Sequence, residues 1–151
     1  MEELYIKEIS TKDPEYPQLL RFRNRILRQP LGLDLMDEDL SGEDKEYILL
    51  VMQGEEILGC VLLQPLENKT VKLRQMAIAE KMQGKGLGKI LLMDAEDAAR
   101  EYGFEKIILH ARQSAQRFYE KSGYQAAGDV FTEVSIPHRF MFKSIFVRQQ
   151  Q

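Results

Sequence analysis

The hexapeptide Gln-Gly-Lys-Gly-Leu-Gly at residues 83–88 places three glycines in the expected connection between a strand and a helix. An apolar, β-rich run at residues 71–78 precedes it, and a strongly helical run at residues 89–102 follows. Glycines allow a tight turn and a close approach of the backbone to a ligand. The first N–H groups of a helix lack intrahelical partners and carry the positive end of its dipole. The hexapeptide therefore predicts a binding site for a phosphate or pyrophosphate.

The spacing of these glycines separates three classes of phosphate-binding loop. A P-loop has Ser or Thr after its Gly-Lys pair, whereas Gly88-Lys89 is followed by Ile90, and no glycine stands five residues before Gly88. A dinucleotide-binding loop has the spacing G-x-G-x-x-G, whereas these glycines alternate. The remaining pattern, Q/R-x-x-G-x-G/A, is matched by Gln83, Gly86 and Gly88. A glycine-rich turn that only connects two elements stays open as the alternative.

Hydrophobic patterning predicts strands and helices that would position this loop. Strands are expected at residues 4–9, 47–52, 57–65, 71–78, 107–110, 125–133 and 136–146, and helices at residues 14–28, 88–102 and 115–121. This order of elements predicts a mixed α/β fold. The first helix should begin with Asp13 as N-cap and Pro14 at its first position, and Gly103 should end the second. The buried side of that second helix is predicted to hold Ile90, Leu91, Ala95 and Ala98.

Length and composition indicate one soluble globular domain over residues 1–151. Hydrophobic residues make up 44% of the chain and charged residues 30%, which is ordinary for such a protein. No stretch approaches the roughly 20 apolar residues of a membrane span, and no secretory signal follows Met1. The single cysteine, Cys60, fits a reducing compartment, so we expect a cytoplasmic protein without a membrane partner. The net charge of -3 argues against nucleic acid as the main partner.

Three ordered pieces of the sequence identify a family. They are K-L-R-Q-M-A-I at 72–78, Q-G-K-G-L-G at 83–88 and A-Q-R-F-Y-E-K-S-G-Y at 115–124. In their order and separations the chain resembles the GNAT superfamily of acetyl-CoA-dependent N-acetyltransferases over nearly its whole length. A further piece, S-I-P-H-R-F-M-F-K at 135–143, resembles the final strand of a bacterial subgroup that carries I-P-H there. The resemblance implies a single-domain α/β GNAT fold, in which a mixed, mostly antiparallel sheet is splayed at the cofactor cleft and flanked by helices.

The resemblance also implies a reaction, in which the acetyl group of acetyl-CoA passes to a primary amine by direct attack in a ternary complex. A non-catalytic module that binds or senses acyl-CoA is the alternative. The residues that would bind acetyl-CoA are Met76, Ala77 and Ile78, through their backbone, together with Gln83, Gly84, Lys85, Gly86, Leu87, Gly88, Lys89 and Arg112. Arg112 stands where GNAT sequences often carry an Asn that contacts the pantetheine arm, which puts that one contact in doubt.

The candidate proton-transfer residues follow from the same resemblance. Tyr119 matches the family's general acid, because a phenol can give a proton to the departing thiolate; a core aromatic is the alternative. His138 is the first candidate for the base that deprotonates the amine, with His110 and Glu133 behind it. Each histidine could equally be structural, and many GNAT members use a chain of waters instead. We expect no metal ion, a small-molecule or peptide amine as acceptor, and leave a homodimer open.

Charged segments bear on the acceptor without identifying it. Three arginines share one face of the first helix, namely Arg21, Arg25 and Arg28. They could guide an acidic acceptor, although a solvated face paired with nearby carboxylates is favoured. The acidic run at residues 34–46 could equally attract a cationic amine or polyamine. Acceptor specificity should lie on the loops around residues 28–46 and 128–137, and loops follow no readable code.

Overall fold

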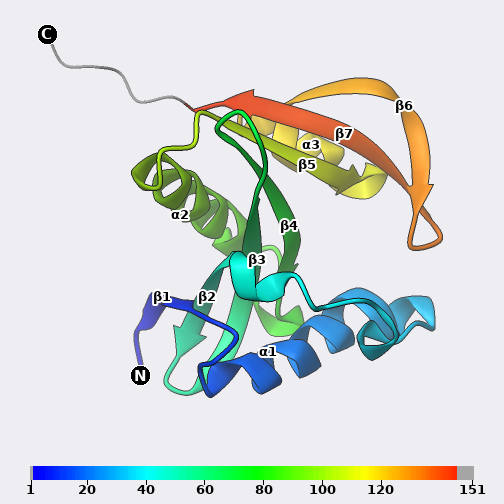
Figure 1. The fold of residues 1–151 in the computed structure, drawn as a ribbon. Helices are drawn as coiled ribbons and strands as arrows, with labels where there is room; N and C mark the ends of the chain where they lie inside the picture. The colour runs from blue at the N-terminus through cyan, green and yellow to red at the C-terminus, as the bar shows by residue number, and fades with distance from the viewer. Residues whose placement is uncertain (1, 146–151) are drawn as a thin grey trace, which may run out of the picture.

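Seven strands form one sheet in the order β1-β2-β3-β4-β5-β7-β6 in the computed structural model, which describes residues 2–145 (Figure 1). The strands are β1 (Leu4–Ile9), β2 (Tyr47–Gln53), β3 (Glu56–Pro65), β4 (Thr70–Ile78), β5 (Lys106–Arg112), β6 (Gln125–Glu133) and β7 (Ile136–Ser144). The α-helices are α1 (Glu15–Arg23), α2 (Leu87–Glu101) and α3 (Gln116–Lys121). Each predicted element is confirmed with ends shifted by a few residues, and position 146 of the predicted last strand lies outside the described part.

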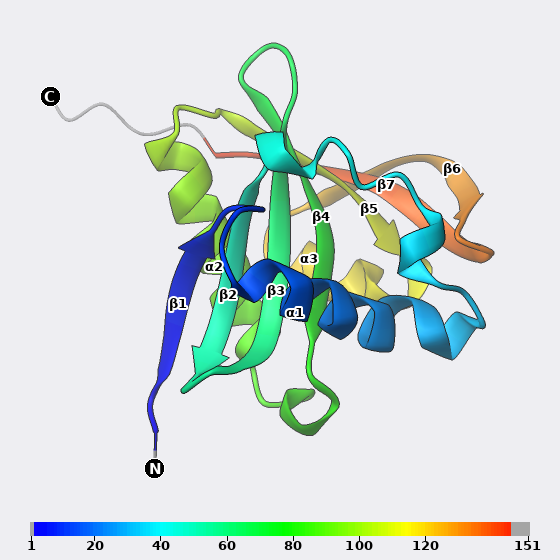
Figure 2. The ribbon, with the colours of Figure 1, turned by 60° about the horizontal axis from the view of Figure 1, so that its bottom comes forward.

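Helices cover both faces of the sheet, which explains the continuous apolar runs in its central strands. Residues 48–52 of β2 and residues 57–63 of β3 are buried at every position. All of them except Gly59 contribute apolar side chains to the core. Figure 2 shows α1 crossing one side of β2, β3 and β4, with α2 behind them. A strand covered on both faces needs apolar side chains in both directions. Within residues 2–145 no helix is long and apolar enough to cross a membrane.

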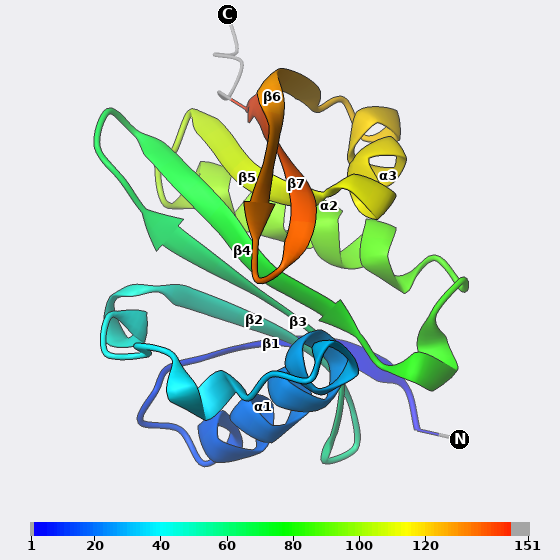
Figure 3. The same ribbon diagram turned by 90° about the vertical axis from the view of Figure 1, so that its right-hand side faces the viewer.

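The sheet splits between its two parallel strands. Pairing of β4 with β5 joins residues 70–73 to residues 106–109 and then stops, although β4 continues to Ile78 and β5 to Arg112. Beyond the pairing the two strands diverge (Figure 3). Within β4, Gln75 has a φ of 58°, and the register with β3 shifts at the same place, which marks a β-bulge. The splayed, mostly antiparallel sheet that was predicted is confirmed.

The N-cap prediction for the first helix is wrong by one residue. Pro14 occupies the cap position, and the Asp13 carboxylate instead accepts a hydrogen bond from the Ser10 N–H at 2.7 Å. The N–H groups that a cap would satisfy are already accounted for, because the Tyr16 N–H donates to the Asp13 carbonyl at 3.0 Å and Pro17 has no N–H. The predicted end near residue 28 is confirmed, but the last turn, residues 24–28, is π-helical.

The prediction that Ile90 is buried is also wrong. Its side chain is 55% exposed, whereas the buried positions of α2 are Leu87, Leu91, Leu92, Ala95, Glu96 and Ala99. The stripe of α2 that faces the sheet passes through Leu91 and Ala95, and one residue before Leu91 already points toward solvent. Ala98 packs at the margin of the core. The predicted stop is confirmed, since Gly103 follows the helix with a φ of 87°.

Candidate active site

The glycine loop between β4 and α2 leaves backbone groups free for a ligand. Gly84 and Gly86 have φ values of 77° and 84°, and a Cβ atom added at either would meet nothing within 4 Å. Gly86 is the N-cap residue of α2, and no side chain caps the helix there. The first N–H groups of α2 therefore have neither an intrahelical partner nor a capping side chain, and they open onto unfilled space.

A cavity of about 450 Å³ adjoins this loop, and we call it the loop cavity. Its lining residues are Ile78, Met82, Gln83, Gly84, Gly86, Leu87, Gly88, Lys89, Phe118, Lys121 and Ser122. The Gln83 amide donates to the Ile78 carbonyl at 3.0 Å, which ties the loop to the end of β4. At Gly88 a Cβ would lie 3.4 Å from the Phe118 ring, which is an ordinary van der Waals contact, so α2 packs closely against α3 at this residue.

A second cavity, of about 390 Å³, lies where β4 and β5 diverge, and we call it the acceptor cavity. It is lined by Leu27, Arg28, Glu38, Lys72, Leu73, Arg74, Gln75, Met76, Leu109, His110, Ala111, Arg112, Ala115, Tyr119, Glu133, Val134 and His138. The two cavities are adjacent, because Met76 and Tyr119 line this one while Ile78 and Phe118 line the loop cavity.

The structure divides the predicted site residues between these two cavities. Tyr119, His138, Met76 and Arg112 meet in the acceptor cavity, and Ile78 joins most of residues 83–89 at the loop cavity. Two predicted cofactor residues, Ala77 and Lys85, line neither cavity. The first is buried in the core and the second is exposed to solvent.

Tyr119 combines a buried ring with a hydroxyl that has no partner. Its ring packs edge-on against Phe118 and Tyr124, with centroids 5.0 and 5.7 Å apart. Its hydroxyl forms no hydrogen bond to any residue of the described range, whereas the Tyr124 hydroxyl donates to the Glu96 carboxylate at 2.9 Å. Burial raises the pKa of Tyr119 well above its ordinary value. The phenol is therefore protonated near neutral pH and available as a donor in the acceptor cavity.

Glu133 lies between two histidines that come from different strands. The His110 Nδ1 atom lies 2.9 Å from one Glu133 oxygen, and the His138 Nε2 atom lies 3.8 Å from the other. Burial favours a higher pKa for Glu133, but the hydrogen bond to His110 and the nearby charges of His110, His138 and Lys72 together outweigh burial, so the pKa lies below its usual range. The His138 Nδ1 atom is 2.9 Å from the Ile136 carbonyl, which can only accept. Neutral His138 therefore carries its proton on Nδ1 and keeps Nε2 free to take another.

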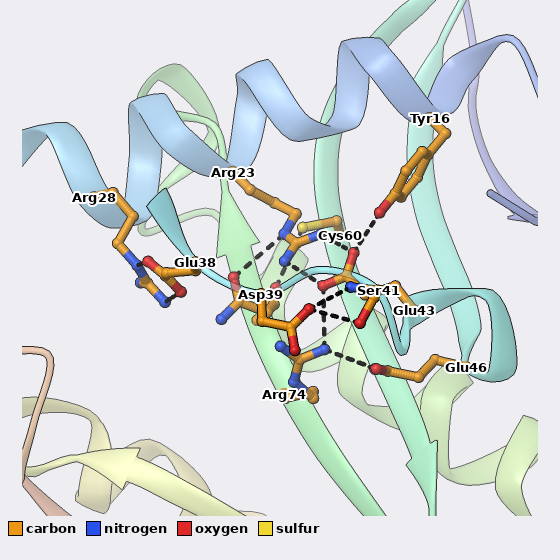
Figure 4. Close-up of polar contacts among 11 residues, drawn as sticks. Tyr16, Arg23, Arg28, Glu38, Asp39, Ser41, Glu43, Glu46, Cys60 and Arg74 are labelled. Carbon is orange, nitrogen blue, oxygen red and sulfur yellow. Dashed lines mark hydrogen bonds and ion pairs between the residues drawn. The ribbon is translucent and has the colours of Figure 1, made fainter. Parts of the chain in front are cut away.

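Sequence reasoning missed a buried ion pair beneath the β4 bulge (Figure 4). Arg23 is 0% exposed, and its guanidinium binds both Glu43 oxygens, at 2.7 and 2.8 Å. The same guanidinium donates through Nε to the Gln75 side chain at 3.2 Å, and the Tyr16 hydroxyl donates to Glu43 at 2.6 Å. The Cys60 thiol donates to the Gln75 carbonyl at 3.2 Å. Both the side chain and the backbone of the bulge residue are thus held from inside the fold.

The surroundings of this ion pair set its charge state. Burial alone would raise the pKa of Glu43, but hydrogen bonds from Arg23 and Tyr16, together with the charges of Arg23 and Arg74, outweigh burial and place the pKa below its usual range. Burial raises the pKa of the Cys60 thiol to about 12, so the predicted inert cysteine stays neutral. One signal could have revealed the pair: position 23 lies four residues after the buried Leu19, on the apolar stripe of α1.

Three of the seven carboxylates in residues 34–46 are paired with arginines. Arg28 pairs with Glu38 from within the acceptor cavity, and Arg74 pairs with Glu46 at 2.7 Å. Arg25 pairs with the exposed Glu80, in the segment before the glycine loop, at 3.3 Å. Pairing of the arginine face with nearby carboxylates is therefore confirmed for two of its members.

Known proteins resemble this chain in sequence and in fold. Residues 8–124 match the model of the acetyltransferase (GNAT) family. The Bacillus subtilis protein YyaT is 29% identical over 93% of this chain and 95% of its own length. The fold is shared with a candidate N-acetyltransferase from Lactobacillus plantarum (TM-score 0.84, 23% identity, 95% of this chain and 99% of that one). It is also shared with an acyl-CoA N-acyltransferase from Pseudomonas aeruginosa (TM-score 0.80, 23% identity, 93% and 99%). With more than half of its length matched by the family model, the chain belongs to the GNAT acetyltransferase family.

Proposed function

We propose that this GNAT protein transfers the acetyl group of acetyl-CoA to a primary amine by direct attack in a ternary complex. The observation that carries the proposal is the split between β4 and β5, which lies beside both cavities. One ligand could reach the reacting atoms from the loop cavity and the other from the acceptor cavity. Holding both reactants together removes much of the entropic barrier to their reaction. The structural neighbour from Pseudomonas aeruginosa is itself an acyl-CoA N-acyltransferase.

The residues around the loop cavity fit the pyrophosphate of coenzyme A. Positive φ values at Gly84 and Gly86, with open space beside both, form a backbone cradle that side chains would fill. The uncapped start of α2 directs N–H groups and the positive end of the helix dipole at an anion. Beyond the last pairing with β5, the backbone of Met76 and Ile78 on β4 would bind the pantetheine amides as an added strand does. When bound, acetyl-CoA supplies the activated acetyl thioester.

His138 is proposed as the general base that takes a proton from the amine. Its free Nε2 atom faces Glu133, whose carboxylate would stabilise the imidazolium that forms. His110, on β5, holds Glu133 in place. The three side chains would thus accept the amine's proton without a change in the fold around them.

Tyr119 is proposed to assist the departing thiolate. Its pKa is raised by burial, whereas a thiol has a pKa near 8.5, so complete transfer of the phenolic proton is uphill. A hydrogen bond from the phenol to the developing negative charge needs no such transfer. We therefore assign Tyr119 a donor role in which charge stabilisation comes first.

A screen of amines tests the proposed function. The protein would be mixed with acetyl-CoA and a panel of amino acids, polyamines, aminoglycosides and peptides, with free thiol and acetylated product measured together. Thiol release that requires an amine, with an equal amount of acetylated product, is the expected result. Binding of coenzyme A without amine-dependent thiol release would instead identify a module that binds acyl-CoA without turnover.

A further inference from the structure

The acceptor cavity is basic, although the chain as a whole has a net charge of -3. Four basic side chains line it, from Arg28, Lys72, Arg74 and Arg112, against two acidic ones, from Glu38 and Glu133. Arg28 and Arg74 are paired with carboxylates, which leaves Lys72 and Arg112 as its basic groups. The potential inside a cavity reflects its own lining more than the distant surface. A cation with several charges, such as a polyamine, would enter an unfavourable field there.

The acidic segment at residues 34–46 offers such a cation little compensation. Three of its seven carboxylates, at Glu38, Glu43 and Glu46, are each held by at least one arginine, and its four aspartates do not line the acceptor cavity. A carboxylate already bound to a guanidinium has little attraction left for an incoming ammonium. The cationic acceptor that the acidic run suggested is therefore disfavoured by the contacts that the run makes.

Arg112 differs from the other arginines of the cavity because it has no carboxylate partner in the described structure. One terminal nitrogen donates to the Leu27 carbonyl at 3.0 Å, and its remaining N–H groups are left for other partners. Burial, and then the charge of Arg28, lower the pKa of the Arg112 guanidinium. An anion bound beside it would relieve both effects. Guanidinium groups bind carboxylates through two parallel hydrogen bonds, which gives orientation as well as affinity.

The position of Arg112 relates it to the proposed base. It lies directly opposite His138 in the antiparallel pairing of β5 with β7, and both side chains line the acceptor cavity. Residues opposite each other in such a pair have Cβ atoms about 4.5–5.5 Å apart. The Arg112 side chain then reaches away from that point to Leu27, within the π-helical turn. A small acceptor could therefore present its amine to His138 and its other end to Arg112.

We propose that Arg112 binds a carboxylate of the acetyl acceptor, so that the substrate class is a small amine that also carries a carboxylate, such as an amino acid. This inference rests on the proposed function and refines it. In this inference Arg112 binds the acceptor, whereas the resemblance to the family, which often carries Asn at that position, had linked it to the cofactor.

The test compares acceptors that differ only in the carboxylate. Amino acids of increasing distance between amine and carboxylate would each be paired with their carboxamides, at saturating acetyl-CoA and equal concentrations of neutral amine. Phosphoethanolamine would be included as an amine with a phosphate. Hydrogen bonds to charged groups contribute about 1.5–3 kcal/mol, so we expect kcat/KM to favour the best carboxylate over its amide by about tenfold or more.

Variants at position 112 assign that preference to Arg112. Arg112→Gln should bring the ratio between carboxylate and amide close to one by lowering only the carboxylate's kcat/KM, and Arg112→Lys should restore part of the ratio. Arg21→Gln removes the same charge from an exposed position outside both cavities and should change nothing. Melting curves would establish that each variant is folded. If Arg112→Gln does not fold, the ratio measured for Arg112→Lys decides the role of Arg112 alone.

Three results would overturn the inference and leave acetyl transfer standing. They are turnover without preference for the carboxylate, a preference that survives Arg112→Gln, and a stronger preference for the phosphate. If no amine is acetylated, the proposed function fails, and calorimetric titration of the coenzyme A complex with the same carboxylates and amides decides the Arg112 site separately. Carboxylate-selective binding that Arg112→Gln removes would support the site, and its absence would refute it.

Discussion

Replacing Glu43 by glutamine tests how strongly the buried ion pair beneath β4 stabilises the fold. Glu43 is 2% exposed and accepts hydrogen bonds from Arg23 at 2.7 and 2.8 Å and from Tyr16 at 2.6 Å. Glutamine keeps the shape, but it removes the negative charge opposite a fully buried guanidinium and sets an NH₂ donor among donors. Breaking a buried ion pair by removing one partner costs about 3–5 kcal/mol, and we expect that loss here.

Urea titration and calorimetry would measure this loss. Domains of this size are commonly stable by about 5–15 kcal/mol, so a large part of the total would disappear. The melting temperature should fall by roughly 6–20 °C, from about 2–4 °C for each kcal/mol. Glu80→Gln makes the same chemical change in the exposed pair with Arg25 at 3.3 Å, and it should leave the melting temperature unchanged within error.

A double variant separates the two possible origins of the loss. Arg23→Met combined with Glu43→Leu removes both charges, and apolar replacement of a buried pair is often neutral or stabilising. It should therefore be more stable than Glu43→Gln alone. A Glu43→Gln protein within about 1 kcal/mol of the wild type would refute the reasoning, since an unpaired buried arginine could not then carry the expected penalty.

Three further tests concern the glycine loop, Tyr119 and the pH dependence of the buried ion pair. Gly86→Val and Gly103→Val each place a branched residue at a positive φ, of 84° and 87°, with open space around it. Each variant should therefore lose about 1–2 kcal/mol of stability or more. Only Gly86→Val should lose coenzyme A affinity, as measured by calorimetry. Tyr119→Phe should lower kcat by about 10², the lower end for one acid, with coenzyme A affinity unchanged; near wild-type kcat would make the hydroxyl dispensable. The pKa of Glu43 is lowered in the folded state, so its contribution to stability is present above the unfolded pKa of about 4.3 and is lost as pH falls through the folded pKa. On acid titration, Glu43→Gln should therefore lose stability less steeply than the wild type.

Local patterns predicted the elements of this fold well, because each depends on neighbouring residues. Alternation and apolar runs located β2 and β3, and the glycine spacing located the start of α2. The Arg23–Glu43 pair could not be read in this way, because it joins residues 20 positions apart, and the Arg23–Gln75 bond spans 52. Such partners are brought together by the packing of α1 on the sheet and not by any local period.

The site was predicted to the level of residue types, but its geometry depends on strand register. Tyr119 and His138 came from sequence motifs, and their meeting in one cavity required β5 and β7 to pair with Arg112 opposite His138. Together with the pairing of β6 with β7, this register places Glu133 between both histidines, which no spacing in the chain reveals. Position in a motif linked Arg112 to the cofactor, which stays a prediction; the structure shows that its side chain donates to the Leu27 carbonyl and lines the acceptor cavity.

The split in the sheet and the buried ion pair belong to one physical problem. A strand that leaves its neighbour inside a sheet exposes backbone groups that must be satisfied, and the departing half of β4 has such an edge. The Gln83 side chain satisfies the Ile78 carbonyl, and a ligand could satisfy others. The positive φ of Gln75 would be unfavourable without support, and Arg23 and Cys60 hold that residue from the core. A change at Arg23 or Glu43 should therefore weaken cofactor binding as well as stability, although neither residue lines a cavity.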